Sequence, residues 1–148
     1  MIIAIGNDHG ATDYKKEIVA MLEGQGHTVI NCGTDDYDSC DYTEYGFAVG
    51  KKVANKEADC GIVLCGTGIG ISIAANKVKG VRCSLCTNTT MAKLTREHND
   101  SNVLSIGQRI IGIELAKDIV NTYINTPFSK ESRHSRRIEQ ITQYELEN

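Results

Sequence analysis

The sequence predicts an α/β protein in which helices cover both faces of a five-stranded parallel sheet, a three-layer sandwich. Short apolar runs alternate with helical patterns from one end of the chain to the other, which is typical of βαβ units. Each apolar run is too short to form a buried helix. No linker, repeat or low-complexity segment interrupts the 148 residues, so we expect one domain over residues 1–148.

The predicted strands are the apolar runs at residues 2–6, 28–31, 61–64, 82–85 and 103–106. We expect them in the order 2-1-3-4-5 of flavodoxin-like, Rossmann-like sheets. Helices fill the intervals. The residues that share an apolar helix face are Tyr14, Ile18, Met21 and Leu22 in the first helix, Tyr45, Ala48, Val49 and Val53 in the second, and Leu115, Ala116, Ile119, Val120 and Tyr123 in the fifth.

The limits of these helices follow from glycine, proline and the strand ends. Gly24 and Gly26 end the first helix, the third begins in the glycine-rich loop after residue 64, and the fourth begins near residues 88–89 and ends near Glu97. The fifth begins at Gly112, and Pro127 ends it.

A last helix is predicted from about Ser132, with Ile138 and Ile141 as its apolar positions and a charged tail at 145–148. Little core is left for this helix to join. A helix beyond a completed sheet commonly docks on a neighbouring subunit, so we expect a homodimer in which it packs on the partner. Packing on the protein's own surface is the alternative.

Composition excludes several classes of function. The net charge is −3 with both signs interspersed, so neither nucleic acid nor an anionic membrane is an expected partner. No run reaches transmembrane length. Residues 1–6 lack the basic lead-in and cleavage site of a signal peptide, so we expect a cytoplasmic protein. Any anion that it binds must be held locally.

The six cysteines fit reduced thiols in a cytoplasm better than a disulfide scaffold. Cys83 and Cys86 have the C-x-x-C spacing of zinc and redox sites. Positions i and i+3 of a strand point to opposite faces, however, so these two thiols cannot chelate one metal. We predict no metal site, and a thiol redox protein is a disfavoured alternative.

Parallel sheets bind ligands where their strands end, near the point at which strand order reverses. This rule selects residues 7–10, 65–70 and 107–109. Cys65 ends a buried strand just before a glycine-rich turn into a helix, so its sulfur should face the positive end of the helix dipole, which favours a reactive thiolate. The glycines let backbone N–H groups converge as an oxyanion hole beside this base.

The glycine-rich loop also fits a purely structural role. It can be a tight turn beside a core cysteine. The G-x-G-x-x-G spacing of dinucleotide sites is absent, and the lysine of a P-loop is missing before Ser72.

Further polar residues could complete a site. Asp8 and His9 follow the first strand and can hydrogen-bond sugar oxygens. His98 offers a second group that titrates near neutral pH, the acid partner that a cysteine base needs. Arg133 and Arg137 are four apart on the last helix, so they can clamp a phosphate. A solvated basic helix start is the alternative.

Six segments together resemble ribose-5-phosphate isomerase type B: GNDH at 6–9, DY at 41–42, CGTGIGISIAANK at 65–77, REHNDSNVL at 96–104, GQR at 107–109 and RHSRR at 133–137. The resemblance runs nearly from end to end. It implies a homodimer with two shared active sites, a sugar phosphate as substrate, and no metal or cofactor. A tetramer of two such dimers is the alternative assembly.

The resemblance also implies residue roles. Cys65 moves a proton between C1 and C2, the amides of 66–70 with Thr67 stabilise the enediolate, and His98 of the partner opens the sugar ring with help from Asp8. The implied substrate-binding residues are Asp8, His9, Tyr42, Gly66, Thr67, Gly68, Ile69, Gly70, Ser72, Asn99, Arg109, Arg133 and Arg137.

Two departures from the family pattern leave the substrate open. Gly10 and Ala11 replace the commoner Ala-Gly, and Thr43 replaces a proline. The expected reaction is the interconversion of ribose 5-phosphate and ribulose 5-phosphate. The alternatives are the same chemistry on a six-carbon sugar such as allose or galactose 6-phosphate, on unphosphorylated sugars, or a non-catalytic module that binds a sugar phosphate.

Overall fold

Five parallel strands form the sheet in the computed structural model of the protein, which describes residues 1–148. The strands are β1 (Ile2–Asn7), β2 (Thr28–Asn31), β3 (Cys60–Cys65), β4 (Cys83–Leu85) and β5 (Val103–Gly107). Each coincides with a predicted strand to within one residue at either end. The parallel α/β prediction is therefore confirmed.

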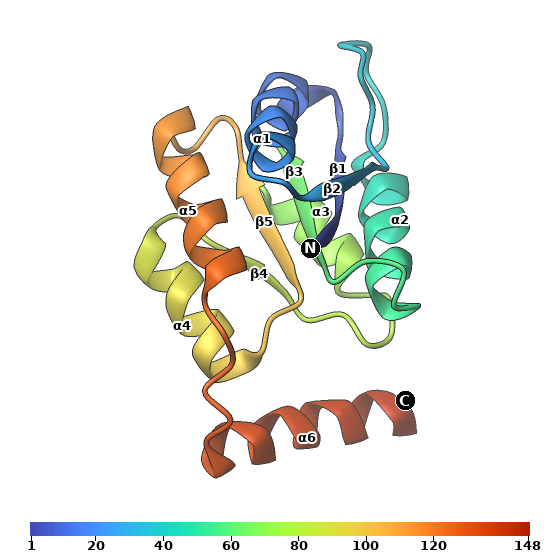
Figure 1. Ribbon diagram of the computed structural model, residues 1–148. Helices are drawn as coiled ribbons and strands as arrows, with labels where there is room; N and C mark the ends of the chain where they lie inside the picture. The colour runs from blue at the N-terminus through green and yellow to red at the C-terminus, as the bar shows by residue number, and fades with distance from the viewer.

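The helices alternate with these strands along the chain. A short 3-10 helix (His9–Ala11) leads into α1 (Thr12–Gly24), and the others are α2 (Tyr42–Ala54), α3 (Ile69–Ala75), α4 (Thr89–Asn99), α5 (Ile113–Asn125) and α6 (Ser132–Glu147). Helices α1, α4 and α5 cover one face of the sheet, and α2 and α3 cover the other (Figure 1). No helix combines the length and the hydrophobicity that a membrane span requires.

The strand order is 2-1-3-5-4, so the predicted order 2-1-3-4-5 is wrong for the last two strands. β5 pairs with both β3 and β4, which leaves β4 at the edge. The physical reason is burial. A central strand of a parallel sheet is apolar on both faces, and every residue of β5 is buried, whereas every residue of β4 is partly exposed.

Each face of the sheet carries its own apolar core. On one face, Ile18 and Leu22 of α1 pack with Ile119 and Val120 of α5. On the other face, Val49 and Val53 of α2 pack with Ile71 and Ala75 of α3 on Val63. The two clusters fix the sheet from both sides, so the loops at its carboxyl edge start from a rigid support.

Two details of the helices differ from the prediction. Leu115 was expected to face the core but is 37% exposed, because it lies about a quarter turn from the centre of the stripe of Ala116, Ile119 and Tyr123. α4 continues to Asn99 and does not end near Glu97, so His98 belongs to the last helical turn and not to a loop.

The last helix begins at Ser132 as predicted and crosses below the amino ends of the strands, apart from both layers (Figure 1). Only His134 is buried in it. Glu145 accepts a hydrogen bond from the backbone N–H of Gly80 at 2.8 Å. Ile141 and Tyr144 are exposed, so α6 presents apolar side chains that the chain itself does not cover.

Candidate active site

Three loops meet where β1, β3 and β5 end. The N–H of Asp8 donates to the carbonyl of Leu64 at 3.3 Å, and the N–H groups of Gln108 and Arg109 donate to the carbonyls of Cys65 and Gly66 at 3.0 and 2.9 Å. The three segments selected from the sequence therefore lie side by side. The prediction that they converge is confirmed.

The thiol of Cys65 lies inside the glycine-rich turn. The backbone N–H of Gly68 donates to its Sγ at 3.1 Å, and the residue is buried. Gly68 has φ 78°, in the left-handed region that glycine adopts without strain, and it caps the start of α3. Ser105 of β5 donates to the carbonyl of Gly68 at 2.6 Å. The loop is thus fixed with a backbone N–H group aimed at the sulfur.

Gly107 should be essential for the shape of this loop. A Cβ atom at this position would overlap the carbonyl group of Thr67, so we expect Gly107→Ala to displace the turn around Cys65. The expected cost is about 1–3 kcal/mol in the free energy of unfolding, together with most of the activity. Gly112→Ala is the control, because no atom lies within 4 Å of the added Cβ. Equal denaturation midpoints and turnover in both variants would contradict this account.

Asp8 and His9 line the neighbouring side of the site. The Asp8 carboxylate accepts a hydrogen bond from the N–H of Gly10 at 2.9 Å and is buried. Nδ1 of His9 accepts the backbone N–H of Cys40 at 3.2 Å. Because Nδ1 is an acceptor, a neutral His9 carries its proton on Nε2, where it can donate to a ligand oxygen.

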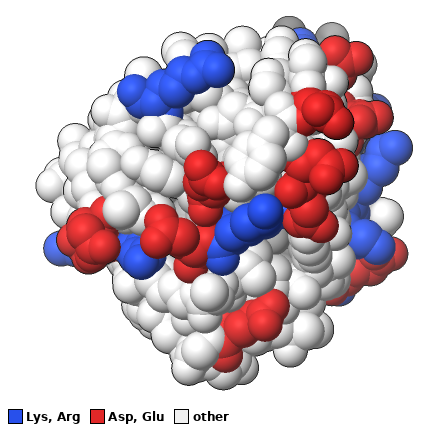
Figure 2. Space-filling model, turned by 90° about the horizontal axis from the view of Figure 1, so that it is seen from above, with Lys and Arg blue, Asp and Glu red and all other residues white.

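The remaining residues of this edge surround the same loop. The guanidinium of Arg109 lies against Gly66, and the ring of Tyr42, at the start of α2, lies against Gly70. Thr67 accepts the N–H of Ile69 at 3.1 Å, and Ser72 donates to the carbonyl of Ile69 at 2.6 Å. Viewed onto this edge, acidic and basic side chains are interspersed and neither sign covers the face (Figure 2).

His98 and Asn99 lie at the opposite edge of the sheet. The carbonyl of Asn99 accepts a hydrogen bond at 3.0 Å from Nε of Arg82, which directly precedes β4. Cys65 ends β3, and the five residue steps of that strand alone span about 16 Å. Within one chain, His98 therefore does not meet Cys65.

Arg133 and Arg137 are also on the far side, at the start of α6. The His134 ring between them contacts the ring of His98, with centroids 4.4 Å apart. Arg133 donates to Glu131 at 2.9 Å, and Nδ1 of His134 lies 2.9 Å from Oγ of Ser129. The structure thus gathers the predicted site residues into two groups, one at each edge of the sheet.

The histidine contact should make stability depend on pH. Burial, and then the charges of His98 and Arg133, lower the pKa of His134 from its usual value of 6.5. The unfolded chain then binds a proton more readily, so the free energy of unfolding should fall as the pH drops below about 6.5. Chemical denaturation at several pH values would measure this slope. We expect His134→Gln to flatten it, and an unchanged slope in that variant would exclude His134 as its source.

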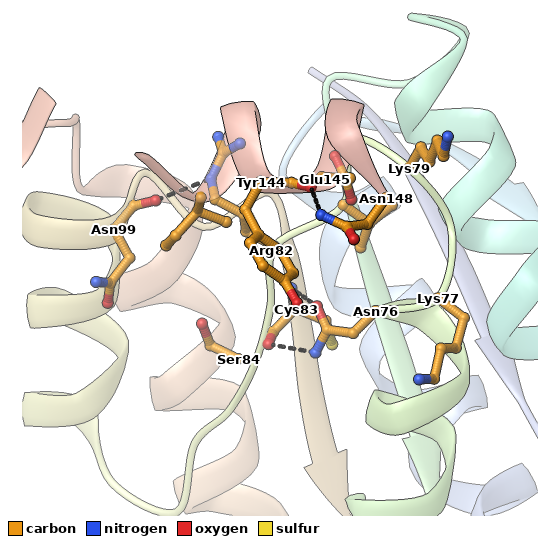
Figure 3. Close-up of a pocket in the computed structure, with 12 residues that line it drawn as sticks. Asn76, Lys77, Lys79, Arg82, Cys83, Ser84, Asn99, Tyr144, Glu145 and Asn148 are labelled. Carbon is orange, nitrogen blue, oxygen red and sulfur yellow. Dashed lines mark hydrogen bonds between the residues drawn. The ribbon is translucent and has the colours of Figure 1, made fainter. Parts of the chain in front are cut away.

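A cavity of about 570 Å³ opens beneath α6 (Figure 3). Tyr144 of the helix and Asn148 just after it line this cavity, together with Asn76 at the end of α3 and with Arg82 and Cys83 at the start of β4. The side-chain amide of Asn76 accepts a hydrogen bond from the backbone N–H of Cys83 at 2.8 Å and donates one to the carbonyl of Cys83 at 3.0 Å. The chain alone does not fill the space between α6 and the sheet.

Three other thiols differ from Cys65 in their surroundings. Burial raises the pKa of Cys60 and Cys83 to about 12 and that of Cys86 to about 11, which keeps them protonated at neutral pH. Cys83 packs with the core under α2 and α3, and Cys86 with the core under α1 and α5. The prediction that these two thiols point to opposite faces is confirmed.

A sequence profile described as ribose/galactose isomerase matches residues 3–141. The chain belongs to this isomerase family. A relative from Escherichia coli, ribose-5-phosphate isomerase B, is 46% identical, over 97% of this chain and 95% of its own length. The structure of the Clostridium thermocellum ribose-5-phosphate isomerase B matches with a TM-score of 0.97 and 47% identity, over 99% of both chains.

A second solved relative carries a ligand. It is the ribose-5-phosphate isomerase B of Mycoplasma genitalium with bound ribulose 5-phosphate, which matches this isomerase with a TM-score of 0.95 and 37% identity, over 99% of this chain and 97% of that one. The resemblance recognised in the sequence is therefore confirmed: the chain is a member of the sugar-phosphate aldose-ketose isomerases.

Sequence reasoning missed three residues that shape the site of this isomerase. The hydroxyl of Ser105 donates a hydrogen bond to the carbonyl of Gly68. The only sequence feature that points to this role is the presence of a polar residue within an apolar strand. Cys40 orients His9 through its backbone, which leaves no signal in a side chain. Lys15 is buried and donates to Asn31, to Asp35 and to the carbonyl of Thr34, so it anchors the loop that leads to Cys40.

Proposed function

We propose that this isomerase interconverts ribose 5-phosphate and ribulose 5-phosphate through a cis-enediolate, with Cys65 as the base. One observation carries the proposal: the Gly68 N–H points at the Cys65 sulfur, inside a glycine-rich loop at the ligand-binding edge of the sheet. As a thiolate, the sulfur can accept a proton from carbon, and the neighbouring amides can hold the oxygen that becomes negative. The bound ribulose 5-phosphate of the Mycoplasma genitalium relative supports this substrate pair.

The proposed reaction moves one proton between adjacent carbons. Cys65 removes the proton at C2 of the open-chain aldose, and the electron pair of that bond forms the enediolate double bond as charge shifts to the carbonyl oxygen at C1. The amides of residues 66–70, with Thr67, stabilise this oxygen. A proton passes from the C2 hydroxyl to the C1 oxygen, which becomes a hydroxyl. The electron pair of the double bond then takes the proton of the thiol at C1 as the C2 oxygen forms the carbonyl of the ketose, and the thiolate is restored. Atoms and electrons balance, and the reaction requires no cofactor.

The ring must be opened first, and we assign this step to His98 of a second copy of the chain, assisted by Asp8. Within one chain, His98 is too distant from Cys65, because the two residues lie at opposite edges of the sheet. The same argument applies to Arg133 and Arg137, which we propose bind the phosphate together with Arg109. Tyr42, His9 and Asn99 would hold sugar hydroxyls, and the loop residues Gly66, Gly68, Ile69, Gly70 and Ser72 complete the pocket.

A homodimer with two shared sites follows from this assignment. Two features support it. Apolar side chains are exposed beside the site on α3 and α4, namely Ile69, Ile73, Met91 and Leu94. Helix α6 exposes Ile141 and Tyr144 over an open cavity. A second copy would cover these surfaces and bring the two groups of site residues together.

All six cysteines are free, which agrees with the cytoplasmic location we propose.

A comparison of sugar phosphates tests the substrate. Purified protein would be incubated with ribose 5-phosphate, allose 6-phosphate and galactose 6-phosphate, and the ketose formed would be measured in each case. We expect kcat/KM to be highest for ribose 5-phosphate. A higher kcat/KM for a six-carbon sugar would show that this sugar is the preferred substrate, and the proposed proton transfer by Cys65 would still apply. Binding of all three without turnover would establish a non-catalytic binding module.

Galactose 6-phosphate is the second candidate substrate, because the family profile that matches the chain covers ribose and galactose isomerases alike. Having both Cys65 and His98 in one chain favours an enzyme that works alone. Turnover of galactose 6-phosphate only after addition of a second polypeptide would favour the alternative.

A further inference from the structure

The turn that ends α4 has an unfavourable backbone conformation. Asp100 has φ 44°, in the left-handed region that residues other than glycine rarely adopt. The turn directly follows His98 and Asn99. It connects α4 to β5 at the amino edge of the sheet. A strained turn persists where the surrounding contacts hold it in place.

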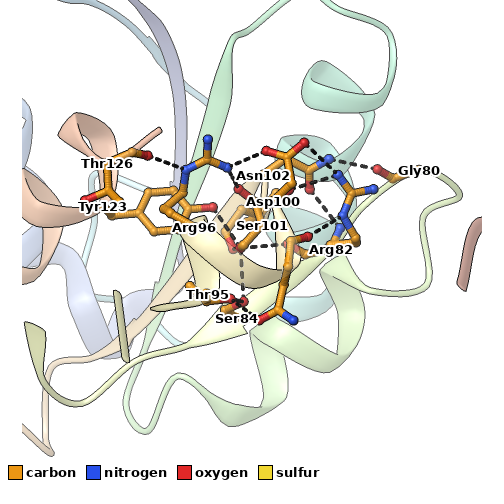
Figure 4. A network of polar contacts seen from close by, with 12 residues as sticks. Gly80, Arg82, Ser84, Thr95, Arg96, Asp100, Ser101, Asn102, Tyr123 and Thr126 are labelled. Carbon is orange, nitrogen blue, oxygen red and sulfur yellow. Dashed lines mark hydrogen bonds and ion pairs between the residues drawn. The ribbon is translucent and has the colours of Figure 1, made fainter. Parts of the chain in front are cut away.

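Two arginines supply those contacts (Figure 4). Arg82 donates from Nε to the carbonyl of Asn99 at 3.0 Å and from Nη2 to the carbonyl of Asp100 at 2.9 Å. Arg96 donates from Nη1 to the Asp100 carboxylate at 2.9 Å and to the carbonyl of Ser101. Both arginine side chains are mostly buried, which strengthens these charge-assisted bonds.

The same network reaches the segment that leads to α6. Nε of Arg96 donates to the carbonyl of Thr126 at 3.0 Å, and its guanidinium lies 5.7 Å from the centre of the Tyr123 ring. Ser101 hydrogen-bonds the hydroxyl of Tyr123 at 2.9 Å. The end of α4, the start of β5 and the approach to α6 are therefore tied into one unit.

Arg82 fixes the orientation of the last turn of α4. It binds two successive carbonyls, those of Asn99 and Asp100, with a planar guanidinium that fixes both at once. These carbonyls set the orientation of the last helical turn, from which His98 projects. Arg82 itself lies at the amino edge of the sheet, away from the Cys65 loop of its own chain.

We propose that Arg82 is a positioning residue for the active site of the neighbouring subunit: by fixing the Asn99 and Asp100 carbonyls, it aims His98 and Asn99 at the substrate held by Cys65 of the second copy. This inference rests on the proposed function and on its shared site. A substitution of Arg82 should therefore lower turnover at the site that contains Cys65 of the other subunit. The site that contains Cys65 of the substituted chain itself should be unaffected.

Subunit mixing tests this prediction. Arg82→Ala alone should lower kcat for ribose 5-phosphate by about 10- to 100-fold, as expected when a catalytic group is displaced by about 1 Å. Arg136→Ala, which removes an exposed arginine of α6, should leave kcat unchanged. Arg82→Ala and Cys65→Ala chains would then be unfolded together and refolded as a mixture. Random pairing should restore about one quarter of the parent activity, because half of the dimers contain one intact site.

The control mixture contains His98→Ala and Cys65→Ala, which tests the shared site itself. Recovery in the control but not with Arg82→Ala would overturn the positioning role and leave the proposed function standing. No recovery in the control would overturn the shared site, and this inference with it. Unchanged kcat in Arg82→Ala would also overturn the inference. If Arg82→Ala does not fold, Arg82→Lys, which keeps the charge but cannot bind both carbonyls in one plane, takes its place in the same mixture.

Discussion

Replacement of Cys65 by alanine should abolish nearly all isomerisation while the protein remains folded. The thiol is the only proposed base in contact with the glycine-rich loop, through the Gly68 N–H at 3.1 Å. Loss of a positioned base typically costs 10²- to 10⁴-fold, so we expect kcat for ribose 5-phosphate to fall by at least about a hundredfold. Steady-state kinetics with EDTA present would measure the change.

The matched control is Cys32→Ala. Cys32 is half-buried, its sulfur lies 3.8 Å from the carbonyl of Ile30, and it has no role in the proposed reaction. Its substitution should leave kcat and KM near the parent values. Thermal unfolding of both variants would separate loss of activity from loss of fold. A folded Cys65→Ala protein that retained parent kcat would show that another group removes the proton.

The second large effect is recovery of activity in a mixture of two inactive variants. Cys65→Ala and His98→Ala should each be inactive as homodimers, because every site lacks one of the two groups. In a mixed dimer, one site combines the intact Cys65 with the intact His98. Random refolding should therefore restore about one quarter of the parent activity, with half of the dimers carrying one working site.

The mixture also has a built-in control. Two preparations of Cys65→Ala refolded together can form no complete site and should show no recovery. If His98 acted within its own chain, the mixed dimer would contain no complete site either. Absence of recovery in a mixture shown by gel filtration to contain dimers would thus contradict the shared site.

Most of the fold could be predicted because periodicity and strand-end chemistry are local properties. The strands were located to within one residue, and Cys65 was correctly placed beside a helix start because glycine-rich turns after buried strands adopt few conformations. The exchange of β4 and β5 could not be predicted in this way. It depends on which strand is buried on both faces, and Cys83–Leu85 and Val103–Gly107 differ only modestly in apolar content.

Local patterns do not predict that the candidate site residues divide between two edges of the sheet; only the family resemblance, which assigns His98 to the partner, implies it. His98 and Arg133 were identified as chemically capable, but their distance from Cys65 depends on the direction of α4 and on the path of the chain after Pro127. Backbone interactions were invisible for a different reason. The Cys40 N–H that orients His9 and the carbonyls that Arg82 binds involve main-chain groups, which every residue type provides.

Isomerisation in D2O tests most directly whether Cys65 transfers a proton between C1 and C2 through an enediolate. Ribose 5-phosphate would be brought to equilibrium with the parent protein and with Cys65→Ala, and deuterium at C1 of the ketose and C2 of the aldose would be followed by NMR. Proton transfer through an enediolate by Cys65 predicts solvent deuterium at these carbons with the parent and almost none with the variant over the same time. Equal incorporation by both proteins, or ketose formed without any deuterium, would contradict it.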